Sequence, residues 1–278
     1  KAFIVIMEKL SFYQNKIISS LENLSFAKAP LELYEPIDYI LSIGGKRIRP
    51  SLLIASYHMF DENVDHAINA ALAIEVFHNF TLLHDDLMDK ANVRRNMATV
   101  HKKWNDSVAI LSGDAMLIKA YELLFTYRFE MLKEIMQFFN QTALKVCEGQ
   151  QYDMNFQIDS TVTVDNYLMM IELKTAALIA ASLKIGAMLA EAPANVVQQI
   201  YQFGINIGIA FQLQDDLLDA FADEESFGKK IGGDILENKK TFLLLTLLEQ
   251  ATVNDKKTVL DWMERTTYDP DEKIKTIK

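Results

Sequence analysis

Cysteine is almost missing from this chain of 278 residues, which contains only Cys147. A single cysteine excludes a disulfide within the chain, so a reducing, cytoplasmic setting is expected. The residues around Cys147 have the composition of a helix interior. We expect its thiol to be buried as a small hydrophobic group and not to act as a nucleophile, because no histidine lies near it in the sequence.

Glycine and proline are also scarce, with 10 and 5 residues, below the average usage of about 7 % and about 5 %. Few turns can form from so few turn residues, so the helices or strands should be long. No stretch shows the period-2 alternation of a strand, whereas several show apolar residues at helical spacing. Because no linker or shift in composition divides the chain, residues 1–278 are predicted to form one all-α domain.

The shortage of glycine and proline leaves one part of the chain ambiguous. Neither residue occurs between Gly113 and Cys147. This stretch is one very long helix, two helices joined by a turn that the sequence does not mark, or a place where residues are missing.

A long uncharged apolar run is missing too, although half of the residues are hydrophobic. Without a run of about 18 such residues, a membrane span is not expected. Positive charge is not in excess either, since 28 Lys and Arg face 38 Asp and Glu, for a net charge of −10. A nucleic-acid partner is disfavoured, because its phosphates require a basic face. Any anionic ligand must be met by local clusters of Lys and Arg or by metal.

Acidic residues do form clusters, and the first follows the apolar run that begins at Phe80. It contains Asp85, Asp86 and Asp89. If the stretch is helical, Asp85 and Asp89 stand at i and i+4 on one face, where like charges repel. A divalent cation between them removes this repulsion, and carboxylate oxygens on a partly open site suit Mg²⁺. On its own, such a cluster is more often a solvated helix end.

A second acidic cluster repeats the pattern far downstream. The segment from Gln212 to Asp219 again follows an apolar stretch, and Asp215 and Asp219 again stand at i and i+4. The repetition favours two metal-binding motifs over two solvated helix ends.

Basic residues gather in two short segments. Lys46 to Arg49 contains three of them and follows Gly44 and Gly45, whose backbone N–H groups can approach a ligand closely. Arg94 and Arg95 come directly after the first acidic cluster and suit bidentate recognition of phosphate. Either segment could also be a solvated loop.

Two polar residues inside apolar stretches each allow two interpretations. His78 lies two helical turns before the first acidic cluster, on roughly the same face. Such a histidine is more often a satisfied core residue than a ligand. Lys174, beside Leu173 and Ala176, is either a surface lysine with a buried stem or a cation directed into a cleft.

Together these motifs resemble those of the trans-isoprenyl diphosphate synthases, the polyprenyl synthetase family. The matching segments are 45–50, 85–89 with 94–95, 149–153, 174–175, 212–219 and 228–241. Each is weak alone, but their order is specific. The resemblance implies the all-α isoprenoid synthase fold, a bundle of long, mostly antiparallel helices around a central cleft, and a homodimer. By the same pattern, the C-terminal helices are incomplete at Lys278.

The resemblance implies the reaction as well. An allylic diphosphate (dimethylallyl, geranyl or farnesyl diphosphate) is ionised and condensed with isopentenyl diphosphate, after which a proton is lost. Mg²⁺ ions, three per site by the family pattern, would be bound by Asp85, Asp86, Asp89, Asp215 and Asp219. The residues implied for catalysis are Asp85, Asp89, Lys174, Asp215 and Lys239.

Two sets of residues are implied for the two diphosphates. The allylic diphosphate would be bound by Arg94, Lys174, Thr175, Gln212, Lys229 and Lys239. Isopentenyl diphosphate would be bound, without metal, by Gly45, Lys46, Arg49, His78 and Arg95.

Product length is implied to depend on Phe77, Phe80 and Thr81, which precede Asp85 on the same helix. The chain has an aromatic residue, Phe80, five positions before Asp85 and a small residue, Thr81, four positions before it. This arrangement resembles that of enzymes that make geranylgeranyl diphosphate. That product is predicted, with farnesyl or longer polyprenyl diphosphates as alternatives. Phe77 and Phe80 could instead be ordinary core residues.

Two other functions compete with this prediction. A terpene cyclase shares the scaffold and one aspartate-rich cluster, but it ionises a single substrate and needs neither the second Asp-Asp-x-x-Asp motif nor the basic segment 46–49. A non-enzymatic helical scaffold would require all of the motifs to have arisen in order by coincidence.

Overall fold

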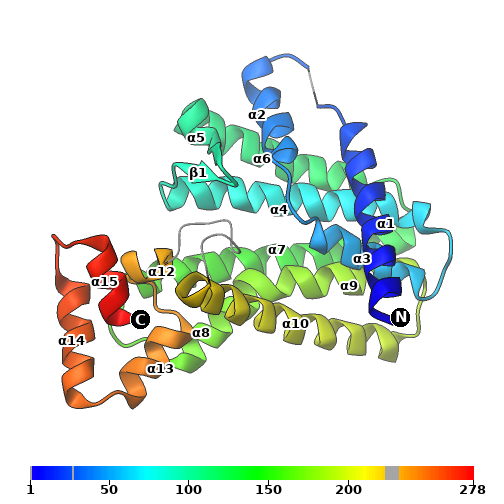
Figure 1. Ribbon diagram of the computed structural model, residues 1–278. Coiled ribbons are helices and arrows are strands. Elements are labelled where there is room, and N and C mark those ends of the chain that lie inside the picture. Colours follow the sequence, from blue (N-terminus) through cyan, green and yellow to red (C-terminus); the bar gives the residue numbers. More distant parts are fainter. Residues whose placement is uncertain (1, 27, 223–231) are drawn as a thin grey trace. The chain divides into compact units, whose positions relative to one another are not determined.

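The computed structural model describes residues 2–26, 28–222 and 232–278 (Figure 1). Its residues divide into two compact units. Unit 1 comprises Lys1–Thr142 with Leu178–Gly204, and unit 2 comprises Ala143–Ala177 with Ile205–Lys278. The prediction of an all-α chain is confirmed, because helices make up most of the described residues. The single domain and the central cleft remain predictions.

Unit 1 consists of helices around one buried helix, α4. Its elements are α1 (Ala2–Glu22), α2 (Leu31–Ser42), α3 (Ile48–His58), the 3₁₀ helix η1 (Val64–Ala67), α4 (Ile68–Met88), β1 (Val93–Arg94), β2 (Met97–Ala98), α5 (Val100–Lys103), α6 (Asp106–Leu124), the start of α7 (Phe129–Ile158), α9 (Ala177–Leu189) and the start of α10 (Ala194–Phe221).

Helix α4 is central in unit 1 because its apolar composition lets several helices pack against it (Figure 1). Every residue from Ala70 to Phe77 is buried, and α4 contacts α1, α2, α3, α5 and α6. The alanines at 70, 71 and 73 have small side chains, so the neighbouring helices can approach α4 closely. The helix that carries the first acidic cluster is therefore held rigidly by the core of unit 1.

Helices α3 and α9 also approach closely within unit 1. The Ser56 hydroxyl donates a hydrogen bond to the Leu183 carbonyl over 2.6 Å. A Cβ atom at Gly186 would lie 2.2 Å from the carbonyl oxygen of Leu53, so only glycine fits there.

The ambiguous stretch after Gly113 forms two helices, α6 and α7, joined by a turn at residues 125–128. Tyr127 stabilises this turn by contacts with a distant part of the chain. Its hydroxyl donates to the His66 carbonyl over 2.7 Å and accepts from the Ala70 N–H over 3.1 Å. Because the turn depends on these contacts, it needs no glycine or proline.

A two-stranded antiparallel ribbon, β1 with β2, was not expected from the sequence. Val93 pairs with Ala98, and Arg94 pairs with Met97. The two residues between the strands, Arg95 and Asn96, have φ values of 51° and 63°. Positive φ at both central residues is the geometry of a tight hairpin turn that matches the twist of its strands. The strands are too short to show an alternating pattern.

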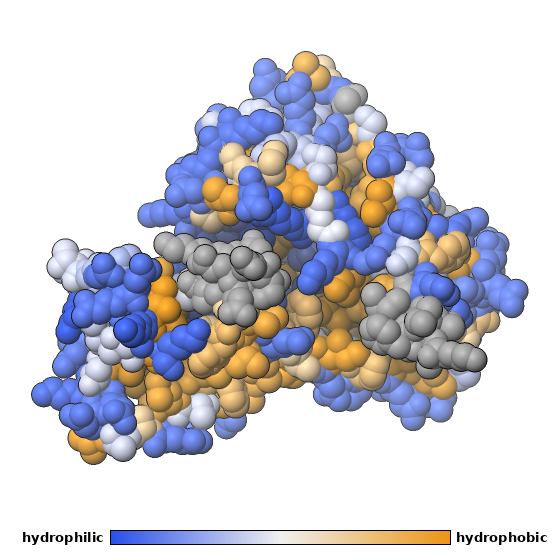
Figure 2. Space-filling view, in the orientation of Figure 1, coloured by the Kyte–Doolittle hydropathy of each residue, from blue (hydrophilic) through white to orange (hydrophobic). Residues whose placement is uncertain are grey.

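Unit 2 contains the end of α7, α8 (Val164–Ile171), the π-helix η2 (Glu172–Ala176), most of α10, α12 (Gly233–Leu236), α13 (Phe242–Gln250), α14 (Val253–Glu264) and α15 (Pro270–Ile277). Its core cluster includes Tyr167, Ile171 and Leu245. Partly buried Leu168 and Phe242 pack against this cluster, and Figure 2 shows apolar side chains gathered over α8 and α13.

The prediction that Cys147 is buried is wrong, although it does lie inside a helix. Its side chain is exposed on α7. The buried positions along α7 include Ile135, Phe139, Thr142 and Val146, which recur at intervals of three or four residues. Cys147 falls one position outside this stripe, so it points away from the core.

Among the described residues, the model has no helix that combines the length and the apolar character needed to cross a membrane.

Candidate active site

The first acidic cluster occupies the C-terminal end of α4. Asp85 and Asp86 lie in the last turn, and Asp89 is the C-cap, with its N–H donating to the Asp85 carbonyl over 2.9 Å. Carboxylates at this end of a helix face the negative end of its dipole and are stabilised only if positive charge is close. The three side chains therefore require a cation nearby.

Arg94 supplies part of this positive charge. Its Nε donates to Oδ2 of Asp86 over 2.8 Å, and its Nη2 lies 3.7 Å from Oδ2 of Asp85. Asp86 is only 2 % exposed, and burial raises the pKa of its carboxyl while Arg94 opposes the rise. Asp85 is half-buried and Asp89 is exposed. Asp86 thus serves as a buried partner of Arg94, whereas the other two carboxylates are accessible from solvent.

The accessible pair suits a hydrated Mg²⁺ ion in its chemistry. Asp85 and Asp89 offer hard oxygen ligands at i and i+4, and Mg²⁺ usually retains waters and substrate phosphate oxygens beside one or two carboxylates. In the part of the chain that the structure describes, no group of three or more His, Cys, Asp or Glu side chains forms a metal cage. The donor set fits an ion that would share its coordination with a ligand.

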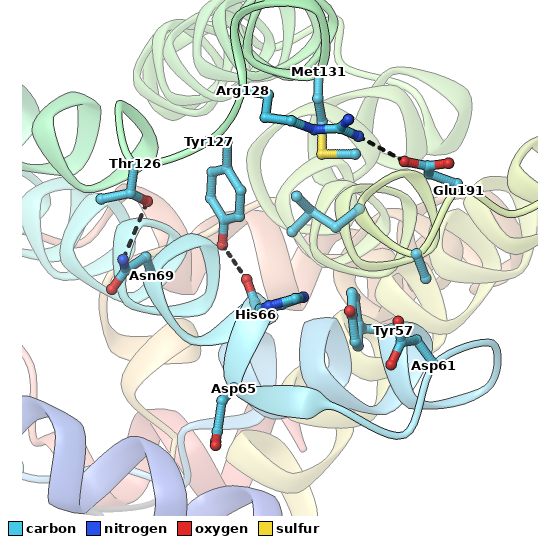
Figure 3. Close-up of a pocket in the computed structure, with 12 residues that line it drawn as sticks. Tyr57, Asp61, Asp65, His66, Asn69, Thr126, Tyr127, Arg128, Met131 and Glu191 are labelled. Atoms are coloured by element: carbon cyan, nitrogen blue, oxygen red, sulfur yellow. Dashed lines mark hydrogen bonds and ion pairs between the residues drawn. The ribbon is translucent and has the colours of Figure 1, made fainter.

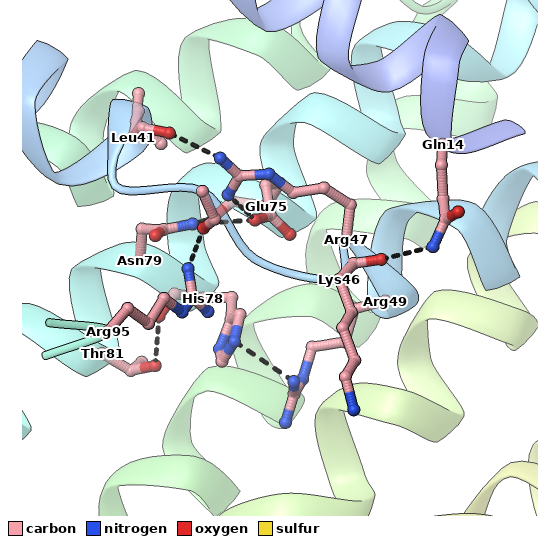
Figure 4. Close-up of polar contacts among 11 residues, drawn as sticks. Gln14, Leu41, Lys46, Arg47, Arg49, Glu75, His78, Asn79, Thr81 and Arg95 are labelled. Atoms are coloured by element: carbon pink, nitrogen blue, oxygen red, sulfur yellow. Dashed lines mark hydrogen bonds and ion pairs between the residues drawn. The ribbon is translucent and has the colours of Figure 1, made fainter. Parts of the chain in front are cut away.

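The basic segment after Gly45 lies beside the middle of α4 (Figure 4). Lys46 is exposed, and Nη1 of Arg49 lies 3.2 Å from Nε2 of His78. Arg95, which comes from the hairpin turn, donates through Nη1 to the Gly44 carbonyl. The structure therefore brings together within unit 1 all five residues that were expected to bind isopentenyl diphosphate.

The surroundings of His78 favour its neutral form. Burial lowers its pKa well below the usual value, and the nearby arginines 49, 95, 94 and 47 lower it further. A guanidinium can only donate hydrogen bonds, so Nε2 of His78 accepts from Arg49 and its proton resides on Nδ1. The convergence of four arginines on one histidine marks a positive region that suits an anion.

Gly45 is required by the approach of Arg95. Its φ is 133°, and a Cβ atom there would lie 2.5 Å from Nη1 of Arg95. Any side chain at this position would displace the guanidinium from the loop.

A cavity of about 110 Å³ in unit 2 collects most of the residues expected to bind the allylic diphosphate. Lys174, Thr175, Gln212 and Lys239 all line it. The remaining lining residues are Asp153, Tyr167, Met170, Ile171, Asp216, Asp234, Lys240 and Thr241. Lys229 lies outside the described residues.

The π-helix η2 directs Lys174 and Thr175 into this cavity. Lys174 Nζ donates to Asp153 Oδ2 over 2.5 Å, and Thr175 Oγ1 donates to Gln212 Oε1 over 2.9 Å. A Cβ atom at Gly149 would lie 2.3 Å from the Lys174 nitrogen, so the glycine lets the backbones of α7 and η2 touch. Single π turns occur mostly at functional sites, because the extra residue redirects side chains.

The second acidic cluster lies on α10. Asp216 is 5 % exposed and accepts hydrogen bonds from the Tyr167 hydroxyl and, over 2.9 Å, from Gln212 Nε2. Asp219 Oδ2 accepts from the Asp234 N–H over 3.0 Å. Asp215 and Asp219 are half-buried, so they resemble Asp85 and Asp89 in being the more accessible members of their motif.

Lys239 lies among carboxylates of unit 2. Its Nζ is 3.5 Å from Asp234 Oδ1 and 3.1 Å from Glu237 Oε2. Burial raises the pKa of Asp234 to about 6, although Lys239 opposes the rise.

Phe77 and Phe80 form an aromatic cluster upstream of Asp85. Their ring centroids are 5.6 Å apart, and Phe77 packs at 5.1 Å from Phe139 of α7. Phe77 is 1 % exposed, whereas Phe80 and Thr81 are half-buried. Phe77 is thus a core residue. Of the three residues expected to set product length, Phe80 and Thr81 are the two that the hydrocarbon tail of a bound diphosphate could reach.

A larger cavity of unit 1, about 700 Å³, contains none of the residues with expected roles (Figure 3). Several of its polar side chains already have partners. Arg128 pairs with Glu191 over 2.9 Å, and Asn69 donates to Thr126 over 3.1 Å. These four side chains are therefore already engaged with one another.

Sequence reasoning missed two residues of the basic region, Arg47 and Glu75. Arg47 was noted only as one charge among three, and Glu75 was given no role. Both are buried and form an ion pair. A glutamate within the otherwise uninterrupted buried run of α4 was the available signal, because a buried carboxylate requires a partner.

Comparisons with known proteins agree with this geometry. The family model described as polyprenyl synthetase matches residues 30–278. A geranylgeranyl diphosphate synthase of Methanosarcina mazei is 38 % identical over 252 residues, which cover 90 % of this chain and 78 % of the relative. A crystal structure of geranylgeranyl pyrophosphate synthase superposes with a TM-score of 0.92 at 45 % identity, covering 96 % of this chain and 83 % of the other.

A third similar protein was solved with ligands. It is a geranyltransferase from Helicobacter pylori, described as complexed with magnesium and isoprenyl diphosphate. Its TM-score is 0.75 at 28 % identity, over 97 % of this chain and 96 % of that chain.

Proposed function

This chain belongs to the polyprenyl synthetase family, and on that premise we propose that it makes geranylgeranyl diphosphate from an allylic diphosphate and isopentenyl diphosphate. It is a short-chain trans-prenyltransferase with the all-α isoprenoid synthase fold. The reaction has three steps: ionisation of the allylic C–O bond, attack of the isopentenyl double bond on the carbocation, and loss of a proton.

The observation that carries the proposal is the group of basic side chains beside α4 in unit 1. Lys46, Arg49, His78 and Arg95 gather beside α4 in unit 1, and none of them lines the cavity in unit 2 that contains Lys174. A terpene cyclase ionises one diphosphate and would have no use for a second set of diphosphate-binding side chains. Two separate diphosphate-binding sets are what a condensation of two substrates requires.

The residues of unit 2 would hold the allylic diphosphate and shield the carbocation. Lys174 and Lys239 supply positive charge, and Arg94 of unit 1 does the same at the first motif. Thr175 and Gln212, which are hydrogen-bonded to each other, present oxygen dipoles toward the developing cation. The departing diphosphate is the base that would take up the proton, since no side-chain base is required.

Asp85, Asp89, Asp215 and Asp219 would hold Mg²⁺, three ions per site, which when bound supplies positive charge to the leaving diphosphate. Asp86 and Asp216 would act behind them, since both are buried and hydrogen-bonded to other side chains. The magnesium and isoprenyl diphosphate in the geranyltransferase crystal support this assignment. By the pattern of the family, the enzyme would act as a homodimer in the cytoplasm.

The geranylgeranyl product is supported by Phe80 and Thr81, the half-buried residues one turn before Asp85. Phe80→Ala should remove a bulky stop and shift the products to longer chains, whereas Thr81→Phe should shift them to farnesyl diphosphate. Product analysis by mass spectrometry with each allylic starter tests both substitutions. An unchanged distribution in both variants would place the end of the pocket on another helix.

The activity itself is tested by release of inorganic diphosphate from purified protein. Release should require Mg²⁺, an allylic diphosphate and isopentenyl diphosphate together. Release from the allylic substrate alone would indicate a cyclase, and no release under any condition would contradict the enzymatic assignment.

A further inference from the structure

Arg47 belongs to the basic segment, but it points away from the side chains of Lys46 and Arg49 (Figure 4). It is 6 % exposed, whereas Lys46 is exposed. Its Nη1 donates to Oε1 of Glu75, and its Nη2 donates to the Leu41 carbonyl over 2.5 Å. Because both terminal nitrogens are engaged inside the protein, Arg47 does not present its guanidinium to a ligand.

The partner of Arg47 is held just as firmly. Glu75 is 2 % exposed and lies within the buried run of α4. Asn79, one turn later, donates through Nδ2 to Oε1 of Glu75 over 3.0 Å and to its carbonyl over 2.8 Å. A buried ion pair is weak evidence of net stabilisation, because desolvation offsets the attraction. The role of the ion pair between Arg47 and Glu75 is therefore sought in the conformation that it imposes on the loop.

The backbone around Arg47 is fixed at several carbonyl groups. Arg47 binds the Leu41 carbonyl, Arg95 binds that of Gly44, and Gln14 of α1 binds that of Lys46 over 2.7 Å. Arg47 itself has a φ of 47°, a left-handed conformation that a non-glycine residue adopts only when its surroundings enforce it. The ion pair with Glu75 and the hydrogen bond to Leu41 are the side-chain contacts of Arg47 that can enforce it.

The same pair sets the distance between the loop and His78. Glu75 precedes His78 by three residues on α4, so the two side chains occupy one region of the helix surface. Lys46 and Arg49 flank Arg47 in the chain. Anchoring Arg47 to Glu75 therefore places Lys46, Arg49 and His78 in a common frame, with Arg49 3.2 Å from His78.

We propose that Arg47 and Glu75 are positioning residues for the isopentenyl diphosphate site, a role that rests on the proposed function. They touch no substrate. Their buried ion pair holds the loop on α4 so that Lys46, Arg49 and His78 converge on one diphosphate.

The decisive variant is Glu75→Gln, because a buried carboxylate cannot itself attract a diphosphate. The substitution should raise KM for isopentenyl diphosphate about tenfold or more, with kcat and KM for the allylic substrate within about twofold. Arg128→Met, which removes an exposed ion pair elsewhere in unit 1, is the matched control and should change none of these constants. If Arg47→Met raises this KM while Glu75→Gln does not, Arg47 contacts the substrate and the proposal is overturned.

The double variant Arg47→Met, Glu75→Leu separates positioning from stability. Removing both charges should restore most of the thermal stability lost in either single variant, because no buried charge is left alone. The raised KM should persist, since the loop is still detached from α4. Recovery of KM together with Tm would show that the pair is merely structural.

Asn79→Ala covers the case in which Glu75→Gln does not fold, because it keeps both charges. It should raise KM for isopentenyl diphosphate by about threefold, through loss of one hydrogen bond that orients Glu75. An unchanged KM would count against the proposal.

Binding of inorganic diphosphate without metal, measured by calorimetry, gives a readout that does not depend on turnover. Wild-type protein should bind it about tenfold more tightly than Glu75→Gln, and Arg128→Met should match wild type. Inactive wild-type protein would overturn the proposed function, while equal binding by wild type and Glu75→Gln would overturn the positioning role.

Discussion

The two aspartate motifs are nearly identical in sequence, but their middle residues are stabilised in different ways. Asp86 in unit 1 is buried against a cation, Arg94, whereas Asp216 in unit 2 is buried against two neutral donors, Tyr167 and Gln212. Burial raises the pKa of both carboxyls. Lys239 opposes the rise in the pKa of Asp216 electrostatically, as Arg94 does for Asp86, so the two carboxyls differ mainly in the donors that hydrogen-bond to them.

This comparison divides each motif into an inner and an outer part. The inner aspartate orients the helix end through hydrogen bonds, and the outer pair at i and i+4 remains accessible. The Asp-Asp-x-x-Asp motif therefore combines residues with two different roles. Only the outer pair is suited to bind an ion from solution.

The largest expected effect is on the outer pair. Asp85→Ala or Asp215→Ala should each lower kcat by about three orders of magnitude or more, because each removes a ligand of the ions that stabilise the leaving group. Steady-state kinetics at saturating Mg²⁺ measures this loss, and circular dichroism should show unchanged helicity. Asp261→Ala, an exposed aspartate of α14, is the control. Near wild-type rates in either variant would mean that the motifs are not equivalent.

A smaller effect should distinguish the basic residues beside α4 in unit 1 from the residues that line the cavity of unit 2. Lys46→Ala or Arg49→Ala should each cost about 2 kcal/mol of binding, a rise of about 30-fold in KM for isopentenyl diphosphate. KM for the allylic substrate should change far less. Two-substrate kinetics measures both constants. Equal effects on both would contradict a selective role for these residues, and a larger effect on the allylic substrate would mean that the two sets of residues are assigned in reverse.

The inner aspartates can be compared directly by stability. Asp86→Asn should lower the free energy of unfolding by about 2 kcal/mol, because Arg94 loses a charged acceptor. Asp216→Asn should cost about 1 kcal/mol, since an amide oxygen can still accept from Tyr167 or Gln212. Urea denaturation measures both values. A larger loss for Asp216→Asn would reverse the distinction between charged and neutral partners.

The smallest effect concerns the dependence of stability on pH in unit 1. Burial and four arginines hold the pKa of His78 below its unfolded value of about 6.5. As the pH falls through 6.5, the unfolded chain binds a proton that the folded protein does not, so stability decreases. The loss between pH 7.5 and pH 5.5 should be smaller in His78→Gln. An equal loss in both proteins would place the responsible group elsewhere.

Much of the fold and of the candidate site could be predicted from residue types and their spacing along the chain. Asp85 and Asp89 share a face in any helix, as do Asp215 and Asp219, and scarce glycine and proline required long helices. These predictions succeeded where they depended only on the geometry of one helix, which does not change with its surroundings.

Other features were decided by contacts between distant residues. The turn between α6 and α7 depends on Tyr127 reaching His66 and Ala70. The π turn at Lys174 requires the close approach that Gly149 permits. Neither contact has a local signature, because the partners lie far apart in the sequence.

The basic segment shows the boundary between the two kinds of information most clearly. Its sequence by itself determined that three cations follow two glycines, and hence that an anion could be bound there. Only the tertiary structure decided that Arg47 turns inward to Glu75 while Lys46 stays exposed and Arg49 meets His78. The reason is physical: composition sets the charge of a segment, but the direction of each side chain depends on the backbone conformation and the partner that folding supplies.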